Sequence, residues 1–203
     1  MSSFSAVEFD AHIAALGLKP GANIIVHSRL ISFGRIEGGL QTIYQALRQA
    51  IGCDGTLAVP AYTMNLDETD VFRRDSTPSF GVGAFSEYVR TLEGAIRSGC
   101  PIHSHAAVGP AAEILLASDE STSLGAGSDF DLLHRNGFDL LLLGCSFHEG
   151  ATFIHHVEAT VGTPYREWIK LNRRVGELEV ERDIEIDYYA KAEDCDLENN
   201  LHA

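Results

Sequence analysis

Three short clusters of polar side chains could carry acid–base chemistry in this sequence. His27 and Ser28 end one apolar run, His103 and Ser104 precede a second, and residues 155–158 (His-His-Val-Glu) follow a third. Histidine is the side chain best suited to moving protons near neutral pH. One histidine at a strand end is more often structural than catalytic. The recurrence of histidine with serine or glutamate in three places predicts one acid–base site assembled from distant segments.

Cysteine and metal chemistry are weaker alternatives. The cysteines Cys53, Cys100, Cys145 and Cys195 are widely separated and form no C-x-x-C pair, so they predict neither a zinc site nor a disulfide framework. Cys100 lies close to His103, which keeps a cysteine nucleophile as an alternative. His148, His155 and Glu158 keep a metal-dependent hydrolase open, but they show no regular three-ligand spacing. The sequence therefore predicts no metal.

The common nucleotide and hydrolase motifs are absent. The chain has no G-x-x-x-x-G-K-[ST], no G-x-G-x-x-G after its first strand, no G-x-S-x-G and no H-E-x-x-H. Residues 32–39 form a glycine-containing loop that ends in Gly38 and Gly39 at the start of a helix. Backbone N–H groups there would suit a phosphate, and a tight turn without a ligand explains the same pattern equally well.

Apolar periodicity predicts the elements that would position these residues. It indicates helices over 4–16, 40–51, 83–92, 109–117 and 152–161, buried strands over 23–27, 55–60 and 138–144, and a strand or hairpin over 177–189. Helices that alternate with strands favour an α/β domain with a largely parallel sheet, whose ligands bind at the carboxyl ends of the strands. Residues 64–82 are a long polar segment, which in a compact domain is usually functional or disordered.

Length, composition and charge narrow the class of protein. The 203 residues, 45% hydrophobic and 22% charged, suit one soluble domain over 1–203 with an acidic, mobile tail over 190–203. No apolar run approaches the roughly 20 residues that span a bilayer, and the N-terminus lacks signal-peptide features, so we expect a cytoplasmic protein without membrane contact. The net charge of -14 argues against nucleic acid and is compatible with a cationic substrate.

A series of motifs runs in one order along the chain. They are Val26-His27-Ser28-x-Leu30, Phe33-Gly34, Glu37-Gly38-Gly39, Val59-Pro60-Ala61-Tyr62-Thr63, Thr77-Pro78-Ser79, Gly83-Ala84, Arg97-Ser98-x-Cys100-Pro101-Ile102-His103-Ser104, Leu124-Gly125-x-Gly127-Ser128-x-Phe130, His155-x-x-Glu158 and Pro164-Tyr165-Arg166. In combination they resemble the aminoglycoside 3-N-acetyltransferase family. The resemblance covers the chain from about Leu16 to Tyr189.

The resemblance implies a three-layer α/β/α fold, distinct from the GNAT acetyltransferases, and acetyl transfer from acetyl-CoA to an amine of a sugar-like substrate. His103 would be the general base in a direct transfer without an acyl-enzyme. Glu158 would either orient His103 or bind the substrate ammonium. The implied cofactor-binding residues are His27, Ser28, Ser32, Phe33, Gly34, Gly38, Gly39, Thr63, Ser104 and Ser128. The implied substrate-binding residues are Tyr62, Asp67, His155 and Glu158.

Some positions depart from the family pattern. Arg29 stands where most members have a second serine, and His105 stands where an aromatic residue is common. The chain is shorter than the resistance enzymes, and shorter relatives acetylate nucleotide-linked amino sugars in polysaccharide synthesis. The resemblance therefore leaves two acceptors open, an aminoglycoside or a nucleotide-linked amino sugar. A non-catalytic relative that binds CoA is a further alternative, and a homodimer is one expected assembly.

Overall fold

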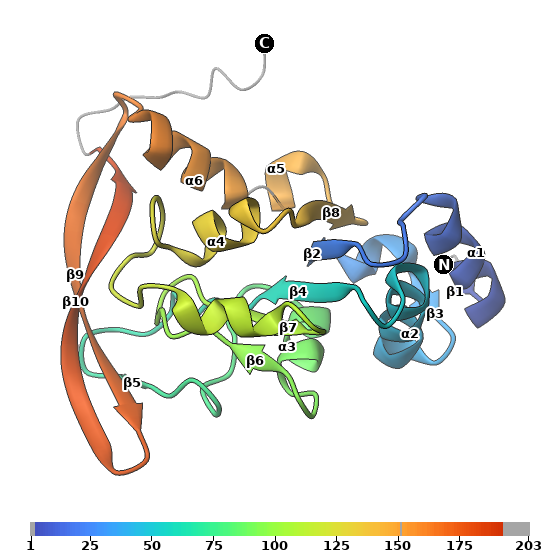
Figure 1. The fold of residues 1–203 in the computed structure, drawn as a ribbon, viewed down its shortest axis with the longest axis horizontal. Coiled ribbons are helices and arrows are strands. Elements are labelled where there is room, and N and C mark those ends of the chain that lie inside the picture. Colours follow the sequence, from blue (N-terminus) through green and yellow to red (C-terminus); the bar gives the residue numbers. More distant parts are fainter. Residues whose placement is uncertain (1–2, 151, 193–203) are drawn as a thin grey trace.

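A five-stranded mixed sheet forms the centre of the computed structural model, which describes residues 3–150 and 152–192 (Figure 1). Its strands, in spatial order, are β6 (Ile96–Arg97), β7 (His105–Val108), β4 (Thr56–Pro60), β2 (Asn23–Ser28) and β8 (Asp139–Leu143). Strands β4, β2 and β8 are parallel, whereas β7 is antiparallel to both β4 and β6. The predicted α/β architecture is confirmed, with an antiparallel extension that the sequence did not indicate.

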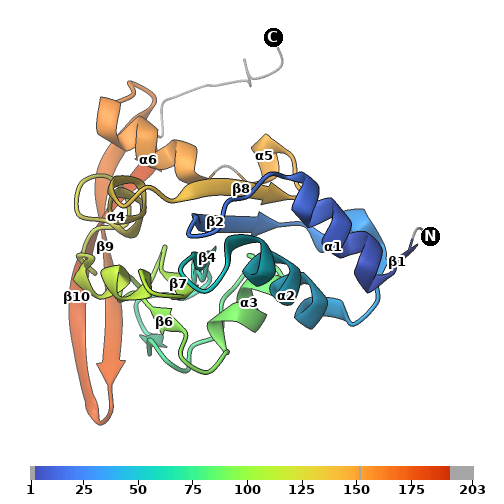
Figure 2. The ribbon, with the colours of Figure 1, turned by 45° about the vertical axis from the view of Figure 1, so that its right-hand side comes forward.

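Helices cover both faces of this sheet. Helices α1 (Ala6–Ala15), α2 (Gly39–Ile51) and α3 (Ala84–Arg90) share one buried cluster with the sheet, and the 3₁₀ helix η2 (Ala112–Ala117) and α4 (Asp129–Arg135) share another (Figure 2). Within β2, Ile24 and Val26 join the first cluster and Ile25 joins the second, because successive side chains point to opposite faces. This double burial explains the continuous apolar run that identified the strand.

A long hairpin lies at the end of the molecule opposite α1 (Figures 1 and 2). It consists of β9 (Arg166–Glu177) and β10 (Val180–Lys191), and the short β5 (Val71–Phe72) pairs with β9. Ile186 of β10 packs on Cys100 and Ile102, next to the histidine motif. Strand β9 was not predicted from the sequence. It is exposed along much of its length and carries many charged residues, so it shows no clear alternation of apolar and polar residues.

The remaining elements complete the layers. They are β1 (Ser3–Phe4), which pairs with β3 (Arg35–Ile36), the 3₁₀ helix η1 (Leu30–Phe33), α5 (Phe147–Gly150) and α6 (Thr152–Val161). The helix predicted over 109–117 is wrong at its start and in its type. Gly109 lies against the Gly55 carbonyl, and Thr56 Oγ1 accepts a hydrogen bond from the Ala111 amide. The six residues that follow form the 3₁₀ helix η2, which is longer than most helices of this type. The predicted mobile tail lies mainly at 193–203, outside the described residues.

Candidate functional site

A cleft of about 730 Å³ opens at the carboxyl ends of β2, β4 and β8. In open α/β sheets, ligands bind in the crevice outside the carboxyl ends of the strands. The end of β2 and the residues after it contribute 27–31, and the segment after β4 contributes Pro60, Tyr62 and Met64. Residues 80–84, which lead into α3, complete this side of the lining. Cys145, Glu149, Gly150 and Thr152 enter from the segment after β8.

Three of the predicted site residues line this cleft: His27, Ser28 and Tyr62. His27 Nε2 and Ser28 Oγ are buried and have no hydrogen-bond partner among the described residues. Burial, with a smaller contribution from the nearby His105, lowers the pKa of His27 to about 4, so the ring is neutral at pH 7. A buried polar atom without a partner is costly unless a ligand supplies one. The two orphaned atoms therefore mark the wall of the cleft as a binding surface.

The rim of the cleft was not predicted from the sequence. Arg29 forms an ion pair of 2.6 Å with Glu149, and both side chains are more than a third exposed. The apolar side chains of Ile31, Met64 and Phe80 are exposed around the same opening. These residues come from three loops, and nothing in their local sequence marks them as neighbours.

His103 lies behind Tyr62, at the start of the antiparallel strand β7. Because β7 runs opposite to β4, its first residues meet the carboxyl end of β4. The His103 and Tyr62 rings lie 5.0 Å apart, and His103 Nδ1 is 2.9 Å from Ser123 Oγ. Burial is the main cause that lowers the pKa of His103 to about 3, with smaller contributions from the neighbouring His105 and His155, so the His103 imidazole is neutral at pH 7. The ring does not itself line the cleft.

Three further predicted residues hold the backbone around His103. Ser104 Oγ donates a hydrogen bond to the Ala61 carbonyl, and Thr63 Oγ1 donates one to the Pro101 carbonyl. Ser128 caps α4 by accepting a hydrogen bond from the Asp131 amide. All three are buried, and their hydroxyls have protein partners. Their contacts fix the loops that form the cleft.

Buried Arg97 ties these loops together. Its guanidinium donates hydrogen bonds to Ser104 Oγ and to the carbonyls of Ala61 and Thr77, and it lies over the Phe72 ring. Burial lowers its pKa to about 10, which leaves it charged at pH 7. The sequence placed Arg97 in a motif but did not indicate that it braces the segment beyond β4.

Glu158 and His155 form a separate polar cluster on α6. Glu158 accepts hydrogen bonds from His155 at 2.7 Å and from the Tyr165 hydroxyl at 2.7 Å, and Arg166 lies 2.8 Å away. Burial alone would raise the pKa of Glu158, but the His155 and Tyr165 hydrogen bonds lower it. The carboxylate is thus occupied by protein donors, and the hydrogen-bond partner of His103 Nδ1 is Ser123 Oγ instead of Glu158.

Other residues implied by the resemblance lie away from the cleft lining. Phe33 packs into the core beneath α1, with its ring 5.7 Å from that of Phe9. Gly38 lines a second hollow of about 500 Å³ with Glu8 and Glu37, carboxylates that would disfavour a phosphate. Ser32, Gly34, Gly39 and Asp67 are exposed. Asp67 Oδ1 accepts hydrogen bonds from the Thr69 amide and hydroxyl.

Beneath Tyr62 lies a buried group that sequence reasoning missed. His105 Nδ1 is 3.1 Å from Asp129 Oδ2, and both side chains are at most 1% exposed. Asp129 Oδ2 also accepts hydrogen bonds from the His105 amide, at 2.7 Å, and from Ser98 Oγ. In the sequence, the one sign of this group was that His105 stands where the family commonly has an aromatic residue. Its partner Asp129 could not be identified, because it lies on a helix that was not predicted.

Two kinds of feature are not found in the described part of the chain. Residues 3–150 and 152–192 contain no group of three or more His, Cys, Asp or Glu side chains arranged to hold a metal ion. No helix within these residues is long and apolar enough to cross a membrane.

We expect the fold to lose stability between pH 6.5 and 5. His103 and His27 have folded-state pKa values of about 3 and about 4, below the usual histidine value of 6.5, so only the unfolded chain takes up protons on these histidines in this range. Each histidine then costs about 2 kcal/mol at pH 5. Urea unfolding at several pH values measures the loss. Glu87, whose pKa of about 2 lies below the usual 4.5, matters only at lower pH.

His103→Gln should remove part of this pH dependence, because glutamine takes up no proton in either state. His12→Gln, an exposed position on α1, is the matched control and should leave the slope unchanged. An equal slope in wild type and His103→Gln would show that His103 is not held neutral in the folded chain.

Comparison with known proteins adds independent information. The family model described as aminoglycoside 3-N-acetyltransferase matches residues 25–201. The aminoglycoside N(3)-acetyltransferase III of Salmonella sp is 33% identical over 175 residues, which cover 77% of this chain and 61% of that protein. The aminoglycoside N(3)-acetyltransferase VIII of Streptomyces fradiae is 31% identical over 192 residues, covering 80% of this chain and 63% of the relative. The chain thus spans about three fifths of these curated relatives.

Solved structures show the same fold. AAC-IIIb in its binary complex with CoASH superposes with a TM-score of 0.83 at 26% identity, covering 93% of this chain and 76% of that chain. A variant of AAC(3)-IVa in complex with apramycin superposes with a TM-score of 0.76 at 25% identity, covering 95% of this chain and 74% of that chain. The expected three-layer architecture is therefore confirmed.

Proposed function

We propose that this chain, which belongs to the aminoglycoside 3-N-acetyltransferase family, transfers an acetyl group from acetyl-CoA to an amino group of a sugar-like amine. The observation that carries the proposal is the cleft at the carboxyl ends of β2, β4 and β8, with the orphaned polar atoms of His27 and Ser28 in its wall. The cleft belongs to a fold shared with a CoA-bound relative.

The residues of the cleft fit the arm of CoA. His27 Nε2 can accept a hydrogen bond or donate one, depending on its tautomer, and Ser28 Oγ can do both, so they match the amide groups of a pantetheine arm. Arg29 at the rim offers a positive charge to a phosphate once its pair with Glu149 opens. Bound acetyl-CoA would supply the acetyl group and the thiol leaving group.

His103 is the proposed general base. Its buried imidazole is neutral at pH 7, the state needed to accept a proton from an attacking amine. Ser123 holds Nδ1, which leaves Nε2 as the nitrogen for proton transfer. Tyr62 lines the cleft and its ring lies 5.0 Å from that of His103, so the amine would react close to Tyr62.

Glu158 remains a second proposed contributor. Its hydrogen bonds to His155 and Tyr165 favour a role in holding α6 against the start of β9 over a direct contact with an ammonium. A lower kcat for Glu158→Gln at unchanged KM would support orientation of His103, and a higher KM for the amine would support substrate binding.

The acceptor is proposed to be a polycationic amino sugar. The net charge of -14 favours a cation and would repel a nucleotide-linked sugar. The test is thiol release from acetyl-CoA with apramycin, other aminoglycosides and amino-sugar nucleotides in parallel. Turnover with aminoglycosides supports the proposal, and turnover only with nucleotides reassigns the acceptor. CoA binding without any turnover would favour a non-catalytic relative. The cytoplasmic location and the homodimer remain predictions.

We expect acetyl-CoA to protect Cys145 from iodoacetamide. Cys145 lines the cleft and is partly exposed, whereas Cys100 is buried. Burial raises the pKa of the Cys145 thiol, so its labelling without ligand should be slow but measurable. Peptide mass spectrometry would follow the labelling of each cysteine.

Exposed Cys53 is the internal control for this experiment, because it lies outside the cleft lining. Its labelling rate should be the same with and without acetyl-CoA. Equal labelling of Cys145 in both conditions would place the acetyl-CoA site elsewhere.

A further inference from the structure

Three side chains connect the cleft to the buried interior. The Tyr62 hydroxyl lies 3.5 Å from His105 Nε2, and His105 Nδ1 lies 3.1 Å from Asp129 Oδ2. Tyr62 lines the cleft together with Thr152. The Phe130 ring packs edge-on against the His105 ring, with 4.8 Å between the ring centroids, and this contact helps to hold His105 in place.

The hydrogen bonds assign a direction to this chain. The His105 backbone amide can only donate, so Asp129 Oδ2, which receives it, is an acceptor. His105 Nδ1 contacts the same oxygen and must therefore carry the hydrogen. In the neutral ring this leaves Nε2 with its lone pair toward Tyr62, so the phenol donates to His105 and its oxygen lone pairs remain available on the cleft side.

The proposed reaction needs more than one proton acceptor. An amino group that binds as an ammonium carries three hydrogens on nitrogen, and the amide product retains one. One of the two released protons ends on the departing thiol and the other must reach solvent. His103 accepts one of these two protons, during attack on the thioester. A second group in the cleft must remove the other proton before attack, because an ammonium has no lone pair and is not a nucleophile.

We propose that Tyr62, His105 and Asp129 form a proton relay that neutralises the bound acceptor ammonium before attack, a role that rests on the proposed acetyl transfer. An ammonium N–H proton passes to Tyr62 Oη while the phenol proton passes to His105 Nε2. One ammonium N–H bond and the original phenol O–H bond break, and a new phenol O–H bond and a His105 Nε2–H bond form. The products are a neutral amine, an intact phenol and a His105 imidazolium paired with Asp129. When C–S cleavage releases the thiolate, Tyr62 gives it a proton and recovers one from His105.

Asp129, in contact with His105 Nδ1, is the group that stabilises the imidazolium formed by this transfer. The titratable groups that face the relay from neighbouring elements are His27 on β2, Arg97 on β6, Cys100 before β7 and His103. The two histidines are neutral at pH 7, so only Arg97 adds positive charge. Burial raises the pKa of Tyr62, which keeps the phenol protonated between transfers. Tyr62 is thus a catalytic residue, and Asp129 is a positioning residue that acts through His105.

The test is the pH profile of Tyr62→Phe with acetyl-CoA and apramycin. Without the relay only amine that is already neutral in solution can react, and its fraction rises tenfold per pH unit below the amine pKa. We expect kcat/KM to be about 100-fold below wild type at pH 6.5 and less than about threefold below it at pH 9. Asp129→Asn should show a smaller defect with the same pH dependence, because an asparagine oxygen can still accept from the His105 amide and Nδ1 but no longer neutralises the His105 imidazolium.

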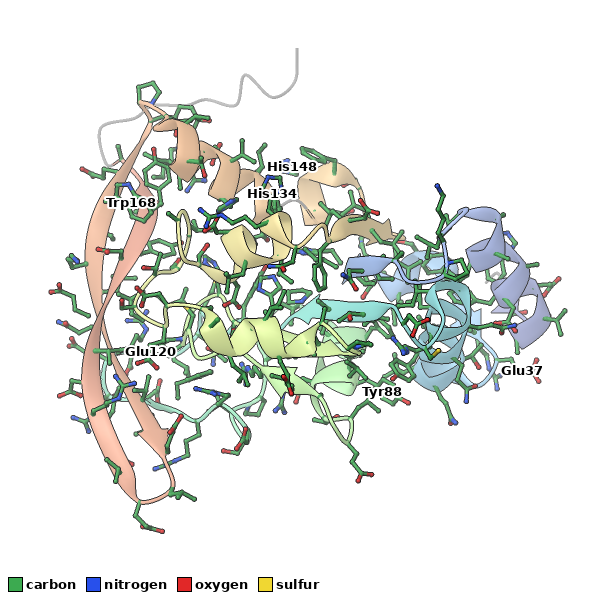
Figure 3. All side chains as sticks on the ribbon, viewed as in Figure 1. Glu37, Tyr88, Glu120, His134, His148 and Trp168 are labelled. Carbon is green, nitrogen blue, oxygen red and sulfur yellow. The ribbon has the colours of Figure 1, made fainter. Side chains whose placement is uncertain are left out.

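Tyr88→Phe is the matched control, since this half-buried tyrosine on α3 lies outside the cleft lining (Figure 3). It should follow the wild-type profile. A Tyr62→Phe defect of equal size at every pH would overturn the relay and leave the acetyl transfer standing. Absence of turnover by wild type with every acceptor in the panel would overturn both. ¹⁵N NMR of wild type gives an independent readout, and a hydrogen on His105 Nε2 would contradict the assigned direction.

Discussion

His103→Ala is expected to lower kcat/KM for acetyl transfer by about 10²–10⁴-fold at pH 7, the range typical for loss of a general base. The physical reason is that alanine cannot accept the amine proton in the transition state. Affinity for CoA should change by less than about threefold, because His103 lies behind Tyr62 and outside the cleft lining. Steady-state kinetics and calorimetry with CoA would measure the two effects separately.

The control for this prediction is His134→Ala, an exposed histidine on α4 (Figure 3). It should retain wild-type kinetics. Because His103 is buried, His103→Gln is needed beside alanine to fill the space and preserve the contact with Ser123. Retention of more than about a tenth of the rate by both His103 variants would exclude His103 as the base and transfer that role to another group.

Arg97→Met should cause the largest loss of stability, about 3–5 kcal/mol in the free energy of unfolding. Methionine keeps much of the apolar stem but removes the donors to Ala61, Thr77 and Ser104. The Thr77 carbonyl loses the Arg97 donor, whereas the Ala61 carbonyl keeps the Ser104 hydroxyl as a donor. A buried carbonyl without a donor costs about 1–3 kcal/mol, and each lost hydrogen bond to a charged group costs about 1.5–3 kcal/mol. Activity should fall as well, because the Ala61 carbonyl lies next to Tyr62. Urea unfolding monitored by circular dichroism would measure the change.

Arg135→Met provides the comparison. The Arg135 side chain is 67% exposed and pairs with Asp131 at 2.9 Å, so its removal should cost less than about 1 kcal/mol. An equal decrease in the free energy of unfolding for Arg97→Met and Arg135→Met would show that the hydrogen bonds of buried Arg97 do not stabilise the loops around the cleft.

The His103 and Arg97 variants test two different roles at one site, proton transfer and structural support. His103 is argued to act on the amine, and Arg97 is argued to hold the segments that carry His103 and Tyr62. A variant of the first kind should remain folded and inactive. A variant of the second kind should lose activity in proportion to the loss of ordered structure, and added acetyl-CoA should stabilise it by mass action.

The sequence alone determined the fold class and the elements that are buried on both faces. The runs at β2, β4 and β8 and the helical spacing of α2 were predicted within a few residues, because burial on opposite faces requires apolar residues in a fixed period. The ordered motifs also determined the family. His27, Ser28 and Tyr62 were located in the site because each follows a strand whose carboxyl end reaches the same edge of the sheet.

Only the tertiary structure decided how the remaining residues divide between chemistry and support. Ser104, Thr63 and Ser128 resemble ligand-binding residues in a sequence, but their hydroxyls are consumed by backbone groups that long-range packing brings near. Asp129 looks like an ordinary helix-start acid until the sheet places it against His105, 24 residues away. Hydrogen-bond partners across such separations depend on the register of β7 on β4, which no local pattern encodes.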